Sequence, residues 1–107
     1  MRKLLAAAAI LGAAAAPAQL AGAQGQRQRI DMKGVAFVPA QVTAHVGDTL
    51  EWVNSDIVAH TATSREGGFD VNVPTGRTGS TVVKKPGTFD YICRYHPNMK
   101  GRIVVEP

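Results

Sequence analysis

The chain has 107 residues, one cysteine, and 12 Lys and Arg residues against 8 Asp and Glu residues, so its formal net charge is +4. This length predicts a single domain, and one cysteine excludes a disulfide within the chain. No run of basic residues stands out, so the charge gives little support to nucleic-acid binding.

Residues 1–23 have the layout of a secretory signal peptide. Arg2 and Lys3 form a positive start, an apolar stretch covers residues 4–16, and two small-residue cleavage triplets follow. A membrane anchor is the alternative, but the apolar stretch is shorter than the roughly 20 residues of a membrane span, and Pro17 interrupts it. We therefore expect a Sec-type signal peptide, export to the periplasm and no stable membrane insertion after cleavage.

Cleavage after Ala23 would leave a mature domain of residues 24–107. That domain has ten basic and eight acidic residues, a formal net charge of +2, so part of the charge of the whole chain comes from the signal peptide. A domain of this size folds alone but buries a modest core. A bound metal would add to its stability, because a ligand that binds only the native state favours that state.

Period-two alternation of apolar and polar residues dominates the mature domain. Such alternation is typical of half-buried β-strands, and no segment repeats apolar residues at helical spacing. Turn signals that contain Gly and Pro separate the candidate strands. The alternating stretches are Ile30–Met32, Val42–Val46, Leu50–Trp52, Phe89–Cys93 and Ile103–Val105. We expect one small all-β sandwich or barrel without repeats or linkers.

Three expected strands position the residues that carry chemistry. Thr49–Asn54 is the first, and His60 lies in the loop that follows it. Phe89–Cys93 is the second and ends at the only cysteine, and Arg102–Val105 is the last strand. The connection between these two strands is expected to cover Arg94–Lys100. One ligand at a rigid strand end and others on a short loop suit a binding site.

Cys93, His96 and Met99 follow one another at three-residue steps. A lone cysteine is often only a small buried apolar residue, but this spacing to His and Met arises by chance in well under about one case in a hundred. A fourth ligand would come from His45 or His60. Because His45 alternates with apolar neighbours, we expect it on the surface, and we favour His60 as the ligand.

Two imidazoles, one thiolate and a weak thioether form a trigonal copper site with an axial methionine. Soft sulfur ligands favour Cu(I), and imidazole suits both oxidation states of copper. Zinc has little use for a methionine, since its catalytic sites combine three N, O or S ligands with water. The four side chains therefore indicate one copper ion that alternates between Cu(I) and Cu(II).

With these residues, the mature chain resembles the cupredoxins, in particular the amicyanin branch of these small blue copper proteins. Phe37–Asp56 is similar to the cupredoxin stretch before the first copper histidine, and Pro86–Val105 is similar to the stretch with the other ligands. The short Cys-x-x-His-x-x-Met spacing and Pro97 fit the amicyanin pattern. The resemblance implies a Greek-key β-sandwich or barrel of the cupredoxin type.

The resemblance also implies three equatorial copper ligands and one axial ligand, in this order: His60, Cys93, His96 and Met99. Two residues depart from the family pattern. Thr61 stands where many cupredoxins have an Asn that braces the cysteine loop, and a threonine can still donate a hydrogen bond with a different geometry. Tyr95 stands where amicyanins often have Pro. We expect both to affect the redox potential and the loop rigidity, because hydrogen bonds around the thiolate tune the metal.

These features predict a periplasmic carrier of single electrons with a type 1 (blue) copper ion, rather than an enzyme. One cysteine is too few for a dinuclear electron-transfer centre, and three histidines are too few for a trinuclear copper cluster. We expect a monomer whose partners are redox proteins such as a c-type cytochrome or a periplasmic dehydrogenase, and the resemblance implies that electrons leave through the exposed edge of His96. The alternative is a periplasmic copper carrier or buffer without an electron-transfer partner.

Overall fold

A computed structural model describes residues 25–107, and these residues form nine β-strands and no helix. The signal peptide predicted for residues 1–23 lies outside the described residues. The all-strand composition confirms the expected all-β fold. The strands are β1 (Arg27–Met32), β2 (Phe37–Val38), β3 (Gln41–His45), β4 (Thr49–Asn54), β5 (His60–Ser64), β6 (Phe69–Val73), β7 (Thr78–Val82), β8 (Gly87–Cys93) and β9 (His96–Glu106).

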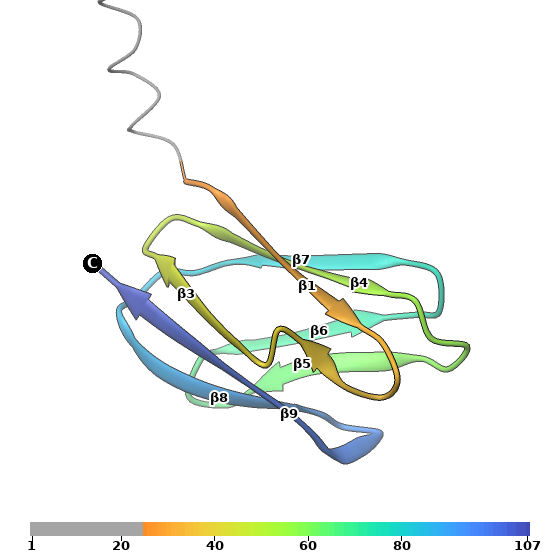
Figure 1. The fold of residues 1–107 in the computed structure, drawn as a ribbon. Helices are drawn as coiled ribbons and strands as arrows, with labels where there is room; N and C mark the ends of the chain where they lie inside the picture. The colour runs from red at the N-terminus through yellow and green to blue at the C-terminus, as the bar shows by residue number, and fades with distance from the viewer. Residues whose placement is uncertain (1–24) are drawn as a thin grey trace, which may run out of the picture.

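The strands form two sheets that pack face to face as a sandwich (Figure 1). One sheet has four strands in the order β2-β1-β4-β7, and the other has five strands in the order β3-β9-β8-β5-β6. The pairs β1–β4 and β3–β9 are parallel, and the remaining pairs are antiparallel. Because strands far apart in the sequence become neighbours, loops from different parts of the chain meet at each end of the sandwich.

The apolar faces of the two sheets enclose one core. On β4, buried residues alternate with half-buried ones, and Leu50 and Trp52 are fully buried. The Trp52 indole N–H donates a hydrogen bond of 3.2 Å to the hydroxyl oxygen of Tyr91, and the two ring centroids lie 5.6 Å apart. Burial raises the pKa of Tyr91 to about 12, so the phenol stays neutral. Each large apolar side chain buried in this way stabilises the fold by about 1.5–3 kcal/mol.

The five stretches with alternating residues all lie in strands, with only Val46 falling one residue beyond β3. The expected strand Thr49–Asn54 has the bounds that the structure gives to β4. Four further strands, β2, β5, β6 and β7, were not predicted. The sequences of β5 and β7 are HTATS and TGSTV, which lack alternating apolar residues: β5 is buried almost throughout, and β7 alternates between half-buried and exposed polar residues.

The connection before the last strand is much shorter than the sequence predicts. The expected loop Arg94–Lys100 and the expected strand bounds Arg102–Val105 are wrong, because β9 already begins at His96. The turn between β8 and β9 contains only Arg94 and Tyr95. The two strands therefore form a tight hairpin, and the residue after the turn is part of the sheet.

Gly101 explains why the sequence places the start of this last strand too late. Buried and exposed residues alternate along β9 from Met99 to Val105, but a glycine occupies the buried position between Met99 and Ile103. A Cβ atom at Gly101 would lie 2.4 Å from the Tyr91 ring. The glycine is therefore required by the close approach of the aromatic ring rather than by a turn.

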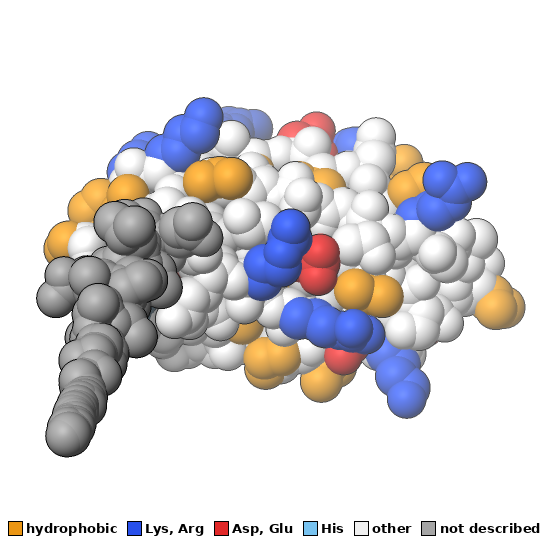
Figure 2. Space-filling model, turned by 90° about the horizontal axis from the view of Figure 1, so that it is seen from above, with side chains coloured by type: hydrophobic (Ala, Val, Ile, Leu, Met, Phe, Trp, Pro, Cys, Tyr) orange, Lys and Arg blue, Asp and Glu red, His pale blue; other side chains and the backbone are white. Residues whose placement is uncertain are grey.

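Within residues 25–107, no helix has the length and apolar character needed to cross a membrane. On the face shown in Figure 2, Lys and Arg side chains are spread among small, separate groups of hydrophobic side chains. Within residues 25–107, basic residues are also paired locally, as in Arg27–Glu51 at 3.1 Å and Arg29–Asp31 at 2.9 Å. Such pairing leaves little unbalanced positive charge along β1.

Candidate metal centre

Three strands bring the candidate ligands together at one end of the sandwich. His60 is the first residue of β5, Cys93 is the last residue of β8, and His96 is the first residue of β9. The C-terminus lies at the opposite end of the molecule (Figure 1). The sequence predicts His60 and His96 in loops, and this detail is wrong, because both histidines occupy strand ends. The sheet therefore fixes the backbone of all three residues.

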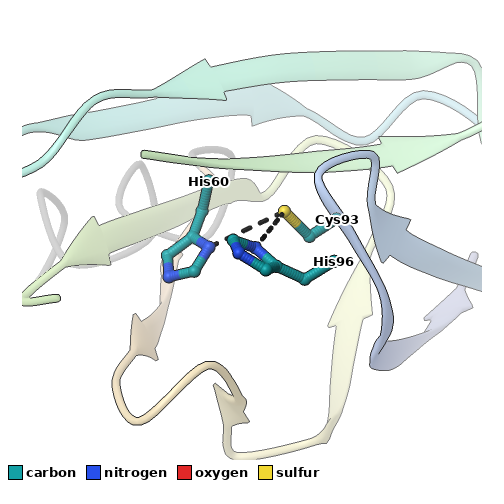
Figure 3. A group of neighbouring side chains, drawn as sticks. All are labelled: His60, Cys93 and His96. Atoms are coloured by element: carbon teal, nitrogen blue, oxygen red, sulfur yellow. Dashed lines mark hydrogen bonds between the residues drawn. The ribbon is translucent and has the colours of Figure 1, made fainter. Parts of the chain in front are cut away.

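The three side chains point toward one another (Figure 3). The Cys93 sulfur lies 3.6 Å from Nδ1 of His60 and 3.6 Å from Nδ1 of His96. The two imidazole rings meet edge to face, with centroids 5.1 Å apart and an interplanar angle of 67°. The nearest ligand atoms of all three residues lie within 4.8 Å of one another. Two nitrogens and one sulfur thus surround a common point.

This arrangement fits a metal ion with two nitrogen ligands and one sulfur ligand. Bonds of about 2.3 Å to sulfur and about 2.0 Å to nitrogen, at trigonal angles, separate the sulfur from each nitrogen by about 3.7 Å. Both sulfur–nitrogen distances in the structure are 3.6 Å. Thiolate and imidazole together are a donor set that suits copper. The residues present therefore fit a trigonal copper site.

Cys93 is fully buried, yet its surroundings favour the thiolate. Burial alone would raise the pKa of the thiol, but this effect is outweighed by hydrogen bonds from the Thr61 amide, at 3.3 Å, and from the rings of His96 and His60. Together they lower the pKa of Cys93 from 9.0 to about 6. Because the thiolate is the form of cysteine that binds metals, the site is prepared for a metal near neutral pH.

Asp56 orients the ring of His60. Its Oδ2 lies 2.8 Å from Nε2 of His60, while Nδ1 of the same ring faces Cys93. The hydrogen bond from His60, followed by those from the Val35 and Gly34 amides, lowers the pKa of Asp56, so the carboxylate is charged and can only accept. Nε2 therefore carries a proton, and Nδ1 is the ring nitrogen that faces Cys93 and is placed to bind a metal. Such carboxylate–histidine pairs orient metal ligands.

Asn54, the last residue of β4, shapes the loop that leads to His60. Its side-chain amide donates to the carbonyl oxygens of Val58 and Val73 at 2.9 Å each, and its Oδ1 accepts a hydrogen bond of 2.9 Å from the Asp56 amide. Sequence reasoning assigned no role to Asn54 or Asp56. An Asn at a strand end followed two residues later by Asp is a turn signal that could have identified them.

His96 is the most exposed of the four candidate ligands. It is half-buried, whereas His60 is 1% exposed and Met99 is 2% exposed. His96 and Met99 line one surface hollow of ≈ 390 Å³ together with Val35, Tyr95 and Pro97. The ring of His96 therefore connects the buried cluster to the surface, while Met99 lies beneath the surface on β9.

Thr61 links the strand of His60 to the turn after Cys93. Its backbone N–H donates to the Cys93 sulfur at 3.3 Å, and its Oγ1 accepts a hydrogen bond of 2.9 Å from the Arg94 amide. The sequence predicts that a threonine in place of the usual asparagine bonds to the loop with a different geometry. In the structure the hydroxyl oxygen accepts a hydrogen bond from the loop, so the turn is braced without an asparagine.

The structure brings His60, Cys93 and His96 into one cluster and buries Met99 on the same hairpin. His45 lies apart, as the sequence predicts. Its side chain is 60% exposed, and its Nε2 is 3.3 Å from a carboxylate oxygen of Glu106. Across residues 25–107, this cluster is the only group of three or more His, Cys, Asp or Glu side chains that converges closely enough to hold a metal ion.

The chain is similar to known proteins in both sequence and fold. A family model for the cupredoxin-like domain matches residues 3–105. Amicyanin-alpha of Methylorubrum extorquens is 34% identical over an alignment 119 residues long, gaps included, and this alignment covers 99% of this chain and 100% of the relative. Two amicyanin structures, a methionine-to-alanine mutant with Cu(I) and a reduced proline-to-phenylalanine mutant, are 25% and 26% identical, each with a TM-score of 0.65 over 73% of this chain and 80% of theirs. The chain therefore belongs to the cupredoxin family, and its cofactor is copper.

Proposed function

We propose that this protein carries single electrons in the periplasm with one type 1 copper ion held by four side chains: His60, Cys93, His96 and Met99. The observation that carries the proposal is the buried triangle of one sulfur and two Nδ1 atoms, with both sulfur–nitrogen distances at 3.6 Å. The amicyanin relatives support the same function. The functional unit is the domain of residues 24–107, after a signal peptide of residues 1–23.

Copper, when bound, supplies a one-electron couple between Cu(I) and Cu(II). The chain contributes a ligand set that is already held in place. Asp56 fixes the ring of His60, and the Thr61 amide holds the thiolate of Cys93. Because these hydrogen bonds do not depend on the metal, the ligands move little when the charge of the site changes. A small rearrangement keeps the barrier to electron transfer low.

The surface around His96 suits brief contact with another redox protein. His96 and Pro97 share a hollow with Val35, which is 45% exposed, and Tyr95, which is 54% exposed. Ile57 is 94% exposed and follows Asp56, whose carboxylate binds the Val35 amide. An exposed group of apolar side chains of this kind marks an interaction site. It gives a c-type cytochrome or a periplasmic dehydrogenase access to the edge of His96.

The charged residues near the hairpin contribute less to recognition. Arg94 is paired with Asp70 at 3.1 Å, and Arg102 is paired with Asp90 at 2.7 Å. Both guanidinium groups are therefore locally neutralised. Lys100 remains as a positive charge close to the hollow in sequence. We infer that apolar contact, rather than a strong positive field, holds the transient complex.

A copper carrier or buffer remains the alternative function, and burial argues against it. A carrier must pass its metal to another protein, which requires accessible ligands. Cys93 is 0% exposed and His60 is 1% exposed, so a receiving protein can reach only the edge of His96. Since three of the four candidate ligands are buried, we propose that the protein is not an enzyme.

The decisive experiment mixes the copper-loaded mature protein with a c-type cytochrome in the opposite oxidation state. We expect rapid electron exchange, recorded as a colour change of both proteins in a stopped-flow spectrometer, with copper retained afterwards. A carrier would instead lose copper to an apo-protein acceptor without changing its oxidation state. Transfer of copper that is faster than transfer of the electron would contradict the proposal.

A further inference from the structure

A closed ring of hydrogen bonds lies beside the turn that follows Cys93. The Arg94 amide donates to Oγ1 of Thr61 at 2.9 Å, and this oxygen lies 2.9 Å from Oγ1 of Thr63. Thr63 in turn donates to Oδ1 of Asp70 at 2.8 Å. The guanidinium Nε of Arg94 donates to the same oxygen at 3.1 Å. The ring therefore begins at the backbone of Arg94 and ends at its side chain.

The direction of each bond in the ring is determined. Thr63 has one hydroxyl proton and gives it to the Asp70 carboxylate, so the Thr61 hydroxyl must donate to Thr63. The Thr61 oxygen then turns a lone pair toward the Arg94 amide. Each member has a partner, and bonds connected in this way strengthen one another. The orientation of the Thr61 hydroxyl thus depends on Thr63 and Asp70.

The ring reaches the copper site at two points. Thr61 directly follows His60, and its amide donates to the Cys93 sulfur at 3.3 Å. Arg94 directly follows Cys93, and its own amide donates to the side chain of Thr61 at 2.9 Å. Since Arg94 is bonded at both its backbone and its side chain, the turn that leaves Cys93 is tied to the strand that begins at His60.

Thr63 and Asp70 stand outside the site. They form a cross-strand pair between β5 and β6, and neither makes a hydrogen bond to a candidate ligand within the described residues. The Asp70 and Arg94 side chains are 56% and 43% exposed, and an isolated pair this exposed contributes little to stability. Here, however, the pair closes a ring that includes Thr61, which is 0% exposed.

We propose that Thr63 and Asp70 are positioning residues for the Cys93 thiolate, and that they act through Thr61 and Arg94. This inference rests on the proposed electron-carrier function and deepens it, because hydrogen bonding around the cysteine sulfur tunes the redox potential of such copper sites. The residue whose amide donates to the sulfur, Thr61, and the turn after Cys93 are thus tied to Asp70 on β6, a strand that carries no candidate ligand.

The first test measures the copper-loaded protein with Thr63→Val. This change removes the hydroxyl, keeps the β-branched shape and alters no charge. We expect a lower reduction potential, because a loosened Thr61 amide withdraws less electron density from the sulfur and leaves Cu(II) favoured. We also expect a loss of copper affinity of about 10–100-fold. Thr63→Ser keeps the hydroxyl, so its potential and copper affinity should match those of the wild-type protein. Thr81→Val is the same change at a half-buried strand position of the other sheet, and it should leave both values unchanged.

The second test needs no copper. Amide hydrogen exchange of Arg94 is measured by NMR in the copper-free protein. Thr63→Val and Asp70→Asn weaken the ring, so we expect roughly three- to tenfold faster exchange of this amide, the change that a lost hydrogen bond gives. Asp90→Asn is the matched control, since it weakens the exposed Asp90–Arg102 pair at 2.7 Å but lies outside the ring. It leaves the exchange of Arg94 unchanged.

The two tests separate the failure of this inference from failure of the proposed function. A wild-type protein without a thiolate–copper absorption band overturns the proposed function. In that case the exchange measurement still tests whether the hydrogen-bond ring holds the Arg94 amide. With a blue wild-type protein, a Thr63→Val potential equal to that of Thr81→Val overturns the positioning role, even where exchange accelerates. Exchange of Arg94 that is equal in Asp70→Asn and Asp90→Asn overturns the ring.

Discussion

His60 and His96 both face one sulfur atom through Nδ1, but their surroundings differ. His60 is buried, and Asp56 accepts the proton of its other ring nitrogen. His96 is half-buried and lines the surface hollow at the end of the hairpin. We infer that His60 anchors the metal inside the protein and that His96 connects it to the outside. A single cluster thus combines a rigid interior with an accessible edge.

Removal of the anchoring imidazole gives a specific prediction. His60→Gly should abolish the blue colour of the copper protein, because the trigonal site loses a nitrogen ligand and gains a cavity of imidazole size. Added imidazole should enter that cavity and restore the absorption band in a titration. His45→Gly is the control and should leave the spectrum unchanged, since His45 is exposed and far from the cluster. Loss of colour in the control instead would show that the ligand assignment is wrong.

Met99 is the subject of a second prediction at this scale. Met99→Leu should retain copper, because an axial thioether bond is weak and contributes little affinity. Its loss should raise the reduction potential, since Cu(II) gains more from the donated electron density than Cu(I) does. Voltammetry of the two proteins measures the difference. An unchanged potential would argue that Met99 is only a buried apolar residue of β9.

The β4–β5 connection shows how one loop carries several tasks. Asp56 binds His60 with one oxygen, accepts the amides of Gly34 and Val35 from the β1–β2 connection, and receives a hydrogen bond from Thr75 at its backbone oxygen. Val35 itself has a positive φ of 55°, an uncommon conformation for a β-branched residue. The carboxylate therefore holds two connections against the ligand histidine.

Replacement of this carboxylate should weaken the site without unfolding the sheets. The side-chain amide introduced by Asp56→Asn has one oxygen where the carboxylate has two. In one orientation its N–H group faces the proton on Nε2 of His60, and in the other it faces the Gly34 amide. We expect a loss of copper affinity of about 10–100-fold, measured by competition with a chelator. Asp31→Asn, a change in an exposed pair with Arg29, is the control. Equal affinities in the two variants would contradict a positioning role for Asp56.

The site was easier to predict from the sequence than the strands around it. Cys93, His96 and Met99 lie within seven residues, so their spacing is visible without a structure. The partners of the ligands are not, because Asp56 acquires its role only where two connections meet. The strand β9 was cut short for a local reason. Gly101 resembles a loop residue in sequence, and only the ring of Tyr91 against it shows that it belongs to the sheet.

The whole molecule has a core that does not depend on the metal. Trp52, Tyr91 and Leu50 are buried between the two sheets, and the ligand cluster lies at one end of them. The two-sheet fold should therefore persist in the copper-free protein. Copper binding adds stability to this fold, because the native state alone presents the complete ligand set.

The lowered pKa of Cys93 makes the stability of the copper-free protein depend on pH. Its pKa is about 6 in the folded protein against a usual value of 9.0. The folded state therefore binds fewer protons than the unfolded state between these values, so stability rises with pH across this window. The stability contributed by the Cys93 thiolate is lost as the pH falls through its folded-state pKa of about 6. The slope is at most about 1.4 kcal/mol per pH unit.

Denaturant unfolding of the copper-free protein across this pH range checks the prediction. Cys93→Ser is the comparison, because a serine hydroxyl does not ionise there, and its free energy of unfolding should lack this rise. Other titrating groups are shared by both proteins, so the difference between the two curves reports Cys93. Parallel curves would mean that the thiol is not ionised in the folded protein before copper binds.

The visible spectrum of the copper(II) protein, recorded beside that of Cys93→Ser, tests the central claim most directly. We predict an intense blue band in the wild-type protein, since a thiolate bound to Cu(II) gives a strong charge-transfer absorption. Cys93→Ser should lack this band and keep the circular dichroism of a β-sandwich. A colourless copper-loaded wild-type protein, or a Cys93→Ser protein that stays blue, would contradict a thiolate copper centre at this position.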